Sequence, residues 1–173
     1  MTIIHIDIDN IIFNFLDKAT LYLLSLTCKN YSNYFGNLTS NNVCTHAAQN
    51  GYLNILQWAR ENKCPWDKKT CALATRNGHL NILQWAREND CPWNTWTWTC
   101  TIAAKNGHLN ILQWARSKGC PWDEWTCAYA AENNHLNILQ WARSNGCPWG
   151  EESCAWSAKN GYLKILDLGS RFV

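Results

Sequence analysis

The residues of this chain with the widest range of possible chemistry are its ten cysteines. Four of them stand in the same tripeptide, Cys-Pro-Trp, at Cys64, Cys91, Cys120 and Cys147. Thiolates can act as nucleophiles, form disulfides or bind zinc. A zinc site needs four convergent ligands, often from Cys-x2-Cys pairs, and this sequence has none, since Cys64 and Cys71 are seven positions apart. We therefore favour thiols that pack in the core, where cysteine is among the residues most often buried.

The histidines repeat along the chain in the same way. His79, His108 and His135 occupy one repeated position, at which the outer copies carry Tyr52 and Tyr162. A catalytic or metal-binding role would not tolerate this exchange, so we expect each ring to bond a neighbouring backbone group. The sequence also has no nucleophile–base pair, phosphate-binding loop or clustered carboxylates. We expect no enzymatic activity, no cofactor and no metal.

These residues belong to a repeated unit, present in four full copies and a partial fifth copy. Five cysteines align the copies at separations of 27, 29, 27 and 27 positions: Cys44, Cys71, Cys100, Cys127 and Cys154. The two additional residues of the longer unit fall in "NTWTW", at 94–98. Insertions in repeat proteins fall in loops, so we expect this segment to be a loop.

Each unit predicts a pair of helices. In the third copy "CTIAAKNG" predicts a short helix that ends at Gly107, and "LNILQWARSK" predicts a second helix that ends at Gly119. Asn110, Gln113 and Arg116 form one polar stripe on the second helix, and apolar residues cover most of the remaining surface. Such a helix needs neighbours on two sides, which stacked copies provide. We therefore expect an all-α fold, a solenoid of stacked helix-turn-helix repeats.

The Cys-Pro-Trp motif marks the exit from each second helix. Its proline cannot continue a helix and biases the preceding cysteine towards an extended backbone. The tryptophan is then placed to cover the helix ends between neighbouring copies. The four tryptophans are Trp66, Trp93, Trp122 and Trp149. A column of arginines could form a basic ladder, but we favour a solvated helix face for Arg60, Arg87, Arg116 and Arg143.

The repeated unit resembles the ankyrin repeat. The stretch "AAKNGHLNILQWARSKG" is similar to the family's Ala-Ala-x-x-Gly-His-Leu-x-x-Val core, and the resemblance covers residues 43 to about 168. The family period is about 33 residues; here "CPWDEW" replaces the family's projecting hairpin and "TC" replaces Thr-Pro-Leu-His. The resemblance implies an array over 43–173 with shortened hairpin loops. This Cys-Pro-Trp form is similar to the divergent ankyrin repeats common in large DNA viruses of amoebae.

Residues 1–36 lie outside the repeats and predict a small helical segment, joined to the array by a polar linker at 37–42. Its simplest role is a cap on the first repeat. The stretch "IIFNFLDKATLYLLSLTCKNY" also resembles the F-box, the module that binds Skp1 in Skp1-cullin-F-box ubiquitin ligases. The resemblance implies Skp1 contacts by seven residues: Ile12, Phe15, Leu16, Leu21, Leu24, Cys28 and Tyr31.

Together the two resemblances imply a substrate-recruiting adaptor of such a ubiquitin ligase. An adaptor catalyses nothing and acts by holding its target near the ligase. The alternative is a plain ankyrin-repeat binding scaffold whose N-terminal helices only cap the array. In both cases we expect a monomer with a protein target on its repeats, and the adaptor would also engage Skp1 and cullin.

Positions that differ between the near-identical copies predict the target-binding surface. They lie on the first helix of each unit and in the connecting segments, and the aromatic residues among them are of the kind that anchors interfaces. The predicted surface consists of His46, Gln49, Leu73, Arg76, Trp96, Trp98, Ile102, Lys105, Trp125, Tyr129, Glu132, Trp156 and Lys159. The sequence leaves open whether some of these aromatic residues instead pack between repeats.

Composition argues against two other classes of partner. Basic residues exceed acidic residues by only 15 to 13 and form no long run, so the charge pattern of a nucleic-acid-binding protein is missing. No apolar run approaches the length of a membrane span, and the N-terminus lacks the features of a secretory signal. We therefore expect a cytoplasmic protein, in the host cytoplasm if the chain is viral, that binds neither nucleic acid nor membrane.

Overall fold

The computed structural model describes residues 43–61, 63–92 and 96–161, which form helices and no strand. This part of the chain is therefore all-α, as the sequence predicts. Its nine helices are α3 (Val43–Asn50), α4 (Leu53–Glu61), α5 (Lys68–Arg76), α6 (Leu80–Glu88), α7 (Trp96–Lys105), α8 (Leu109–Ser117), α9 (Glu124–Glu132), α10 (Leu136–Ser144) and α11 (Glu151–Lys159). The seven F-box-like residues, the predicted N-terminal segment at 1–36 and the linker at 37–42 lie outside the described residues.

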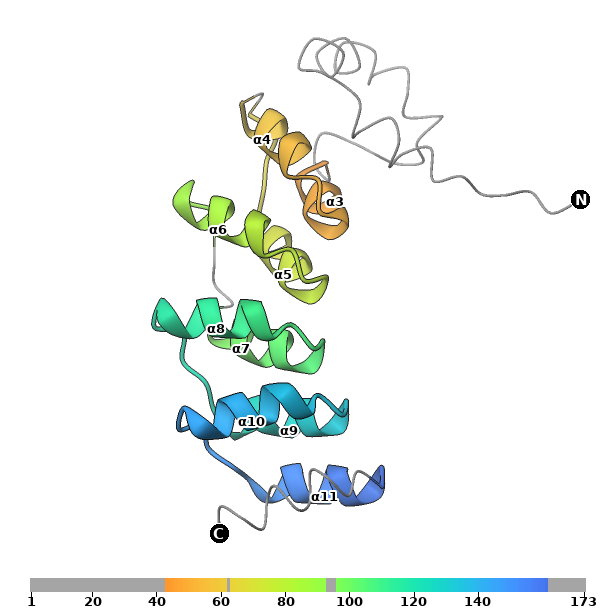
Figure 1. The fold of residues 1–173 in the computed structure, drawn as a ribbon. Coiled ribbons are helices and arrows are strands. Elements are labelled where there is room, and N and C mark those ends of the chain that lie inside the picture. The colour runs from red at the N-terminus through yellow and green to blue at the C-terminus, as the bar shows by residue number, and fades with distance from the viewer. Residues whose placement is uncertain (1–42, 62, 93–95, 162–173) are drawn as a thin grey trace, which may run out of the picture.

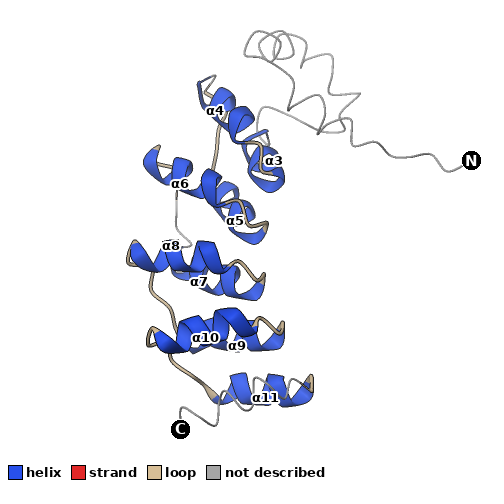
Figure 2. Ribbon diagram, in the orientation of Figure 1, coloured by secondary structure: helices blue, strands red, loops and turns tan. Residues whose placement is uncertain are grey.

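The helices lie in pairs, and the pairs stack in one column (Figures 1 and 2). Each first helix contacts the second helix of its own unit, in the pairs α3–α4, α5–α6, α7–α8 and α9–α10. The first helices also contact one another in sequence, from α3 to α5, α7, α9 and α11. None of the helices in these three described ranges is long and apolar enough to cross a membrane.

The core is assembled from the same small set of side chains in every unit. The second helix α8 buries Ile111, Leu112 and Ala115, and the first helix α7 buries Cys100 and Ala103 on the facing side. Small residues on the first helices allow neighbouring helices to approach closely, while the isoleucine and leucine fill the space between units. Each unit therefore presents an apolar surface that is covered only when further units stack against it.

An aspartate after the first and third Cys-Pro-Trp motifs begins the next unit. Asp67 caps the N-terminus of α5, where its carboxylate accepts a 2.8 Å hydrogen bond from the Lys69 backbone N–H and Thr70 completes a capping box. The carboxylate of Asp123 caps α9 by accepting a 3.1 Å hydrogen bond from the Trp125 backbone N–H. A capping aspartate satisfies backbone donors that otherwise lack partners. The motif therefore ends one helix pair and starts the next.

The sequence prediction that residues 94–98 form a loop is wrong for its second half. Helix α7 begins at Trp96, so Trp96 and Trp98 lie in its first turn. α5 begins three positions before Cys71 and α7 begins four positions before Cys100, so part of the insertion lengthens the helix. Aromatic and β-branched residues are weak helix formers, and contacts of α7 with α8 and α9 decide the outcome instead.

The turn before each motif cysteine adopts a left-handed backbone conformation. Gly119 and Gly146 have φ of 82° and 80°, whereas Lys63 and Asp90 stand at the same place in the first two units with φ of 59° and 57°. Glycine adopts this conformation without the steric cost that a Cβ atom brings. The first two units therefore carry backbone strain that the next two avoid.

We expect Asp90→Gly to raise the free energy of unfolding by about 1 kcal/mol, because it removes the left-handed penalty at this turn. Urea denaturation followed by tryptophan fluorescence measures the change. Lys63→Gly is the matched variant, since it relieves the same strain but removes a charge of the opposite sign. A stabilisation seen for only one of the two would point to charge rather than backbone strain.

Candidate functional site

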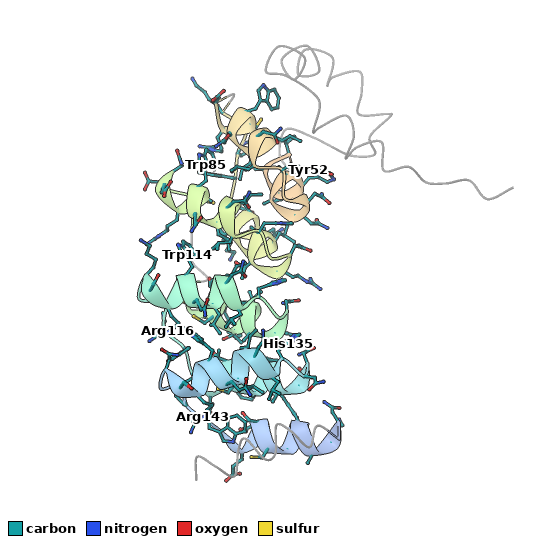
Figure 3. The ribbon with its side chains drawn as sticks, in the orientation of Figure 1. Tyr52, Trp85, Trp114, Arg116, His135 and Arg143 are labelled. Carbon is teal, nitrogen blue, oxygen red and sulfur yellow. The ribbon has the colours of Figure 1, made fainter. Side chains whose placement is uncertain are left out.

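The repeated histidines join neighbouring units. His108 Nε2 lies 2.9 Å from the carbonyl oxygen of Arg76, at the end of the preceding first helix, and donates a hydrogen bond to it. The same bond joins His79 to Gln49 at 3.0 Å and His135 to Lys105 at 3.1 Å. The prediction that these rings bond neighbouring backbone is confirmed. Figure 3 shows His135 on the opposite side of the column from Arg116 and Arg143.

A glycine in the preceding unit makes room for each of these rings. Gly78 has φ of 84°, and a Cβ atom placed on it would lie 2.9 Å from His108 Cε1. Gly51 and Gly107 face His79 and His135 in the same way, at 2.8 and 2.9 Å. The fourth copy carries Asn134 in this position, with φ of 60°, and the copy after it has tyrosine in place of histidine. Glycine thus occurs wherever the next unit supplies a histidine.

Three of the repeated arginines hold the Cys-Pro-Trp motifs of their own units. The guanidinium of Arg116 donates a hydrogen bond to the Cys120 carbonyl, and its central carbon lies 4.1 Å from the Trp122 ring centroid. Arg60 and Arg143 make the same two contacts in their units, with ring distances of 4.3 and 5.7 Å. A cation over an indole face is attracted to it. The prediction of a solvated helix face is therefore wrong for these three arginines.

The motif tryptophans extend the packing to the next unit. The Trp122 ring meets Trp141 of α10 edge-on, with centroids 5.7 Å apart, and Trp66 lies at the same distance from Trp85 of α6. Aromatic pairs in tilted or edge-to-face arrangements stabilise a fold beyond the area that they bury. The sequence prediction that these tryptophans bridge neighbouring copies is confirmed for both pairs.

The cysteines of the first helices are core residues, as predicted. Cys44, Cys71, Cys100 and Cys127 are buried. Burial raises the pKa of Cys44 to about 11, so its thiol is protonated at neutral pH and is a poor nucleophile. Cys154 differs because it is exposed and accepts a 3.2 Å hydrogen bond from the Trp149 indole. In the three described ranges, no group of three or more potential ligand side chains could hold a metal ion.

A groove opens between the first helices of the second and third units. It encloses about 500 Å³, and none of its described lining residues is acidic. Its apolar part is formed by Ala72, Leu73 and Ile102, and its polar part by Lys69, Arg76, Lys105 and Asn106. This groove, called the basic groove below, combines an apolar surface with three positive charges.

An aromatic cluster adjoins the basic groove further along the column. Trp125, Tyr129 and Trp156 lie on α9 and α11, with ring centroids 5.4 to 6.1 Å apart. Lys105, which lines the groove, places its ammonium 4.8 Å from the Tyr129 ring centroid and so connects the two features. Trp98 is 60% exposed and Trp125 is 39% exposed, although tryptophan is highly buried on average in folded proteins.

The structure brings together seven of the thirteen residues predicted to bind a target. Four line the basic groove and three form the aromatic cluster. The cluster packs across two units while Trp125 stays exposed, so its members combine the two roles that the sequence leaves open. The remaining predicted residues on these first helices are His46, Gln49, Trp96, Trp98, Glu132 and Lys159. The side chain of Trp96 lies outside the described residues.

Sequence comparison of the copies missed the other members of the basic groove, Lys69, Ala72 and Asn106. Lys69 and Arg76 are seven positions apart and therefore share one face of α5, which is a signal that the sequence contains. No protein-family model and no curated protein matches the chain. Function is therefore inferred from the chemistry of this surface and from the sequence motifs.

Proposed function

We propose that residues 43–173 form an ankyrin-like solenoid that binds a protein target on its first helices. One observation carries the proposal: the basic groove and the aromatic cluster adjoin on α5, α7, α9 and α11, where Lys105 links them and Trp125 is exposed. The side chains that could support catalysis have other tasks in the described units, since histidines join units and most cysteines are buried. A surface without reactive groups suits binding rather than chemistry.

The solenoid proposal rests on the junctions between units. Each histidine bonds the backbone of the preceding unit, beside a glycine that leaves space for the ring. Gly-His is also the part of the unit that most resembles the ankyrin core. Contacts between nearest neighbours along a column are the defining property of repeat proteins. The segment between units is short because the Cys-Pro-Trp motif stands where the ankyrin family has a projecting hairpin.

The chemistry of the surface indicates the kind of target. Exposed tryptophans supply large apolar contacts at low conformational cost and are the most frequent anchors of protein interfaces. Lys69, Arg76 and Lys105 favour a target segment that carries acidic side chains near an apolar one. The bound protein would therefore place an apolar residue against Leu73 and Ile102 and its carboxylates against the surrounding cations.

We expect the double substitution Trp98→Ala, Trp125→Ala to reduce target binding about tenfold or more, because it removes both exposed anchors. The measurement is affinity capture from a cell lysate on the immobilised full chain, quantified by mass spectrometry. Gln113→Ala, Gln140→Ala is the matched control, since both glutamines are exposed on second helices. A protein lost from the control but retained by the tryptophan variant would contradict the proposal.

We further propose that the protein is a monomeric, cytoplasmic adaptor that recruits this target to an Skp1-cullin-F-box ubiquitin ligase. The F-box-like stretch in residues 1–36 supports this role, and a plain scaffold with a helical cap is the alternative. Leu21→Asp and Leu24→Asp are expected to abolish binding of the full chain to purified Skp1, because a charge disrupts the apolar contact face. Failure of the folded wild-type chain to bind Skp1 would leave the scaffold.

A further inference from the structure

Each full unit contains a pair of cysteines that the fold brings together. One cysteine lies on the first helix and the other in the Cys-Pro-Trp motif, always 20 positions later: Cys44 and Cys64, Cys71 and Cys91, Cys100 and Cys120, Cys127 and Cys147. In the second unit the Cys71 and Cys91 sulfur atoms lie 3.2 Å apart. In the third unit the Cys100 sulfur lies 3.9 Å from the carbonyl oxygen of Cys120.

In the fourth unit the Cys147 sulfur lies 3.5 Å from the carbonyl oxygen of Asp123, the residue that caps the helix carrying Cys127. The first unit resembles the third, because the Cys44 thiol lies 3.8 Å from the carbonyl oxygen of Cys64. The fixed interval of 20 residues is visible in the sequence. Cysteines that are closest in sequence, such as Cys64 and Cys71, belong to different units, so a search for closely spaced cysteines does not find the pairs.

Two motif cysteines lie against the start of the first helix of their own unit. The Cys91 sulfur is 3.8 Å from the carbonyl oxygen of Asp67, which caps α5, and Cys147 has the same relation to Asp123, which caps α9. For Cys71 and Cys91, a disulfide requires the sulfurs to approach from 3.2 Å to about 2.05 Å. Rotation of the two side chains can supply a movement of this size, so the helices need not separate.

We propose that the four cysteine pairs are sites of reversible oxidation, in which each pair forms a disulfide within its unit by exchange with a small-molecule disulfide such as oxidised glutathione. The thiolate of one cysteine attacks a sulfur of the reagent, forms a mixed disulfide and releases one glutathione thiolate. The second cysteine then attacks the protein sulfur and displaces the other glutathione. Two protein thiols are oxidised, one glutathione disulfide is reduced, and the two protons pass to the glutathione thiols.

Exposure sets the order of reaction. Cys64 is partly exposed, whereas Cys91, Cys120 and Cys147 are buried, so a reagent reaches the first unit most easily. The inner pairs react when their units open locally. Each disulfide closes a loop that includes both helices of its unit and joins the end of the second helix to the first. Oxidation therefore stabilises the helix pair without altering the order of units.

The test is a disulfide map of the full chain after exposure to glutathione redox buffers under native conditions. Free thiols are blocked with N-ethylmaleimide in denaturant, and trypsin with chymotrypsin separates neighbouring cysteines before mass spectrometry. We expect linked peptides that join Cys44 to Cys64 first and the three inner pairs later, with dithiothreitol reversing all four. Cys154→Ser should leave this pattern unchanged, because Cys154 belongs to no pair.

Cys64→Ser is expected to remove the Cys44 link and to leave the inner pairs able to form. Two results would overturn the proposal: glutathione attached to single cysteines without paired products, or disulfides that join neighbouring units, such as Cys64 to Cys71. The wild-type map decides between these outcomes even if the serine variant does not fold. An increase in Tm on oxidation, absent after dithiothreitol, is the independent measurement of the stabilising effect.

Discussion

Gly78→Ala is expected to lower the free energy of unfolding by about 2–4 kcal/mol. Two costs combine at this position. The added methyl must adopt φ of 84°, which side chains other than glycine disfavour, and it would lie 2.9 Å from the His108 ring. Displacing the ring also threatens the 2.9 Å hydrogen bond from His108 to Arg76, which joins the second and third units. Urea denaturation, followed by circular dichroism, measures the loss.

Gly119→Ala is the control that separates the two costs. Gly119 has φ of 82°, but a Cβ atom placed there would meet nothing within 4 Å. Its substitution should therefore cost about 1 kcal/mol, the backbone penalty alone. The double variant Gly78→Ala, His108→Ala should show coupling, because without the ring the methyl has no steric conflict. Equal destabilisation by the two glycine variants would contradict a close junction between units.

Leu112→Ala is expected to lower the free energy of unfolding by about 2–5 kcal/mol. The Leu112 side chain is fully buried in the third unit, within the core that neighbouring units share. Its truncation removes apolar contacts and leaves a cavity, because helices held by units on both sides relax only partly. The change is measured by the same denaturation experiment.

Leu109→Ala is the matched control for the buried leucine. Leu109 lies on the same helix but is only partly buried, so its truncation should cost clearly less than that of Leu112. Leu139 occupies the equivalent buried position of the fourth unit, and Leu139→Ala should reproduce the effect of Leu112→Ala. A small effect at both buried leucines would mean that the units do not share a core.

Much of the fold follows from repetition in the sequence. Because "LNILQWAR" recurs with few changes, its helical spacing and its buried isoleucine and leucine can be predicted once for all copies. The outer copies carry tyrosine at the position of His79, His108 and His135, and this difference predicts a backbone contact, which the structure confirms. That contact crosses between units, which the sequence of one unit could not show.

Other features depend on which units become neighbours. Arg116 looks like a surface residue on its own helix, but the chain returns after Gly119 and brings Trp122 against the guanidinium. The basic groove likewise draws Lys69 and Lys105 from different units. The sequence does not predict the start of α7 at Trp96, because the residues there are weak helix formers. Tertiary contacts outweigh this local preference.

The central claim is that the first helices carry the target-binding surface. Hydroxyl-radical footprinting of the full chain, with and without its captured target, tests this claim directly. We predict that the target protects Trp98 and Trp125 from oxidation and leaves Trp85 and Trp114, on the second helices, as reactive as in the free chain. Protection confined to the second-helix tryptophans, with Trp98 and Trp125 unchanged, would contradict the account.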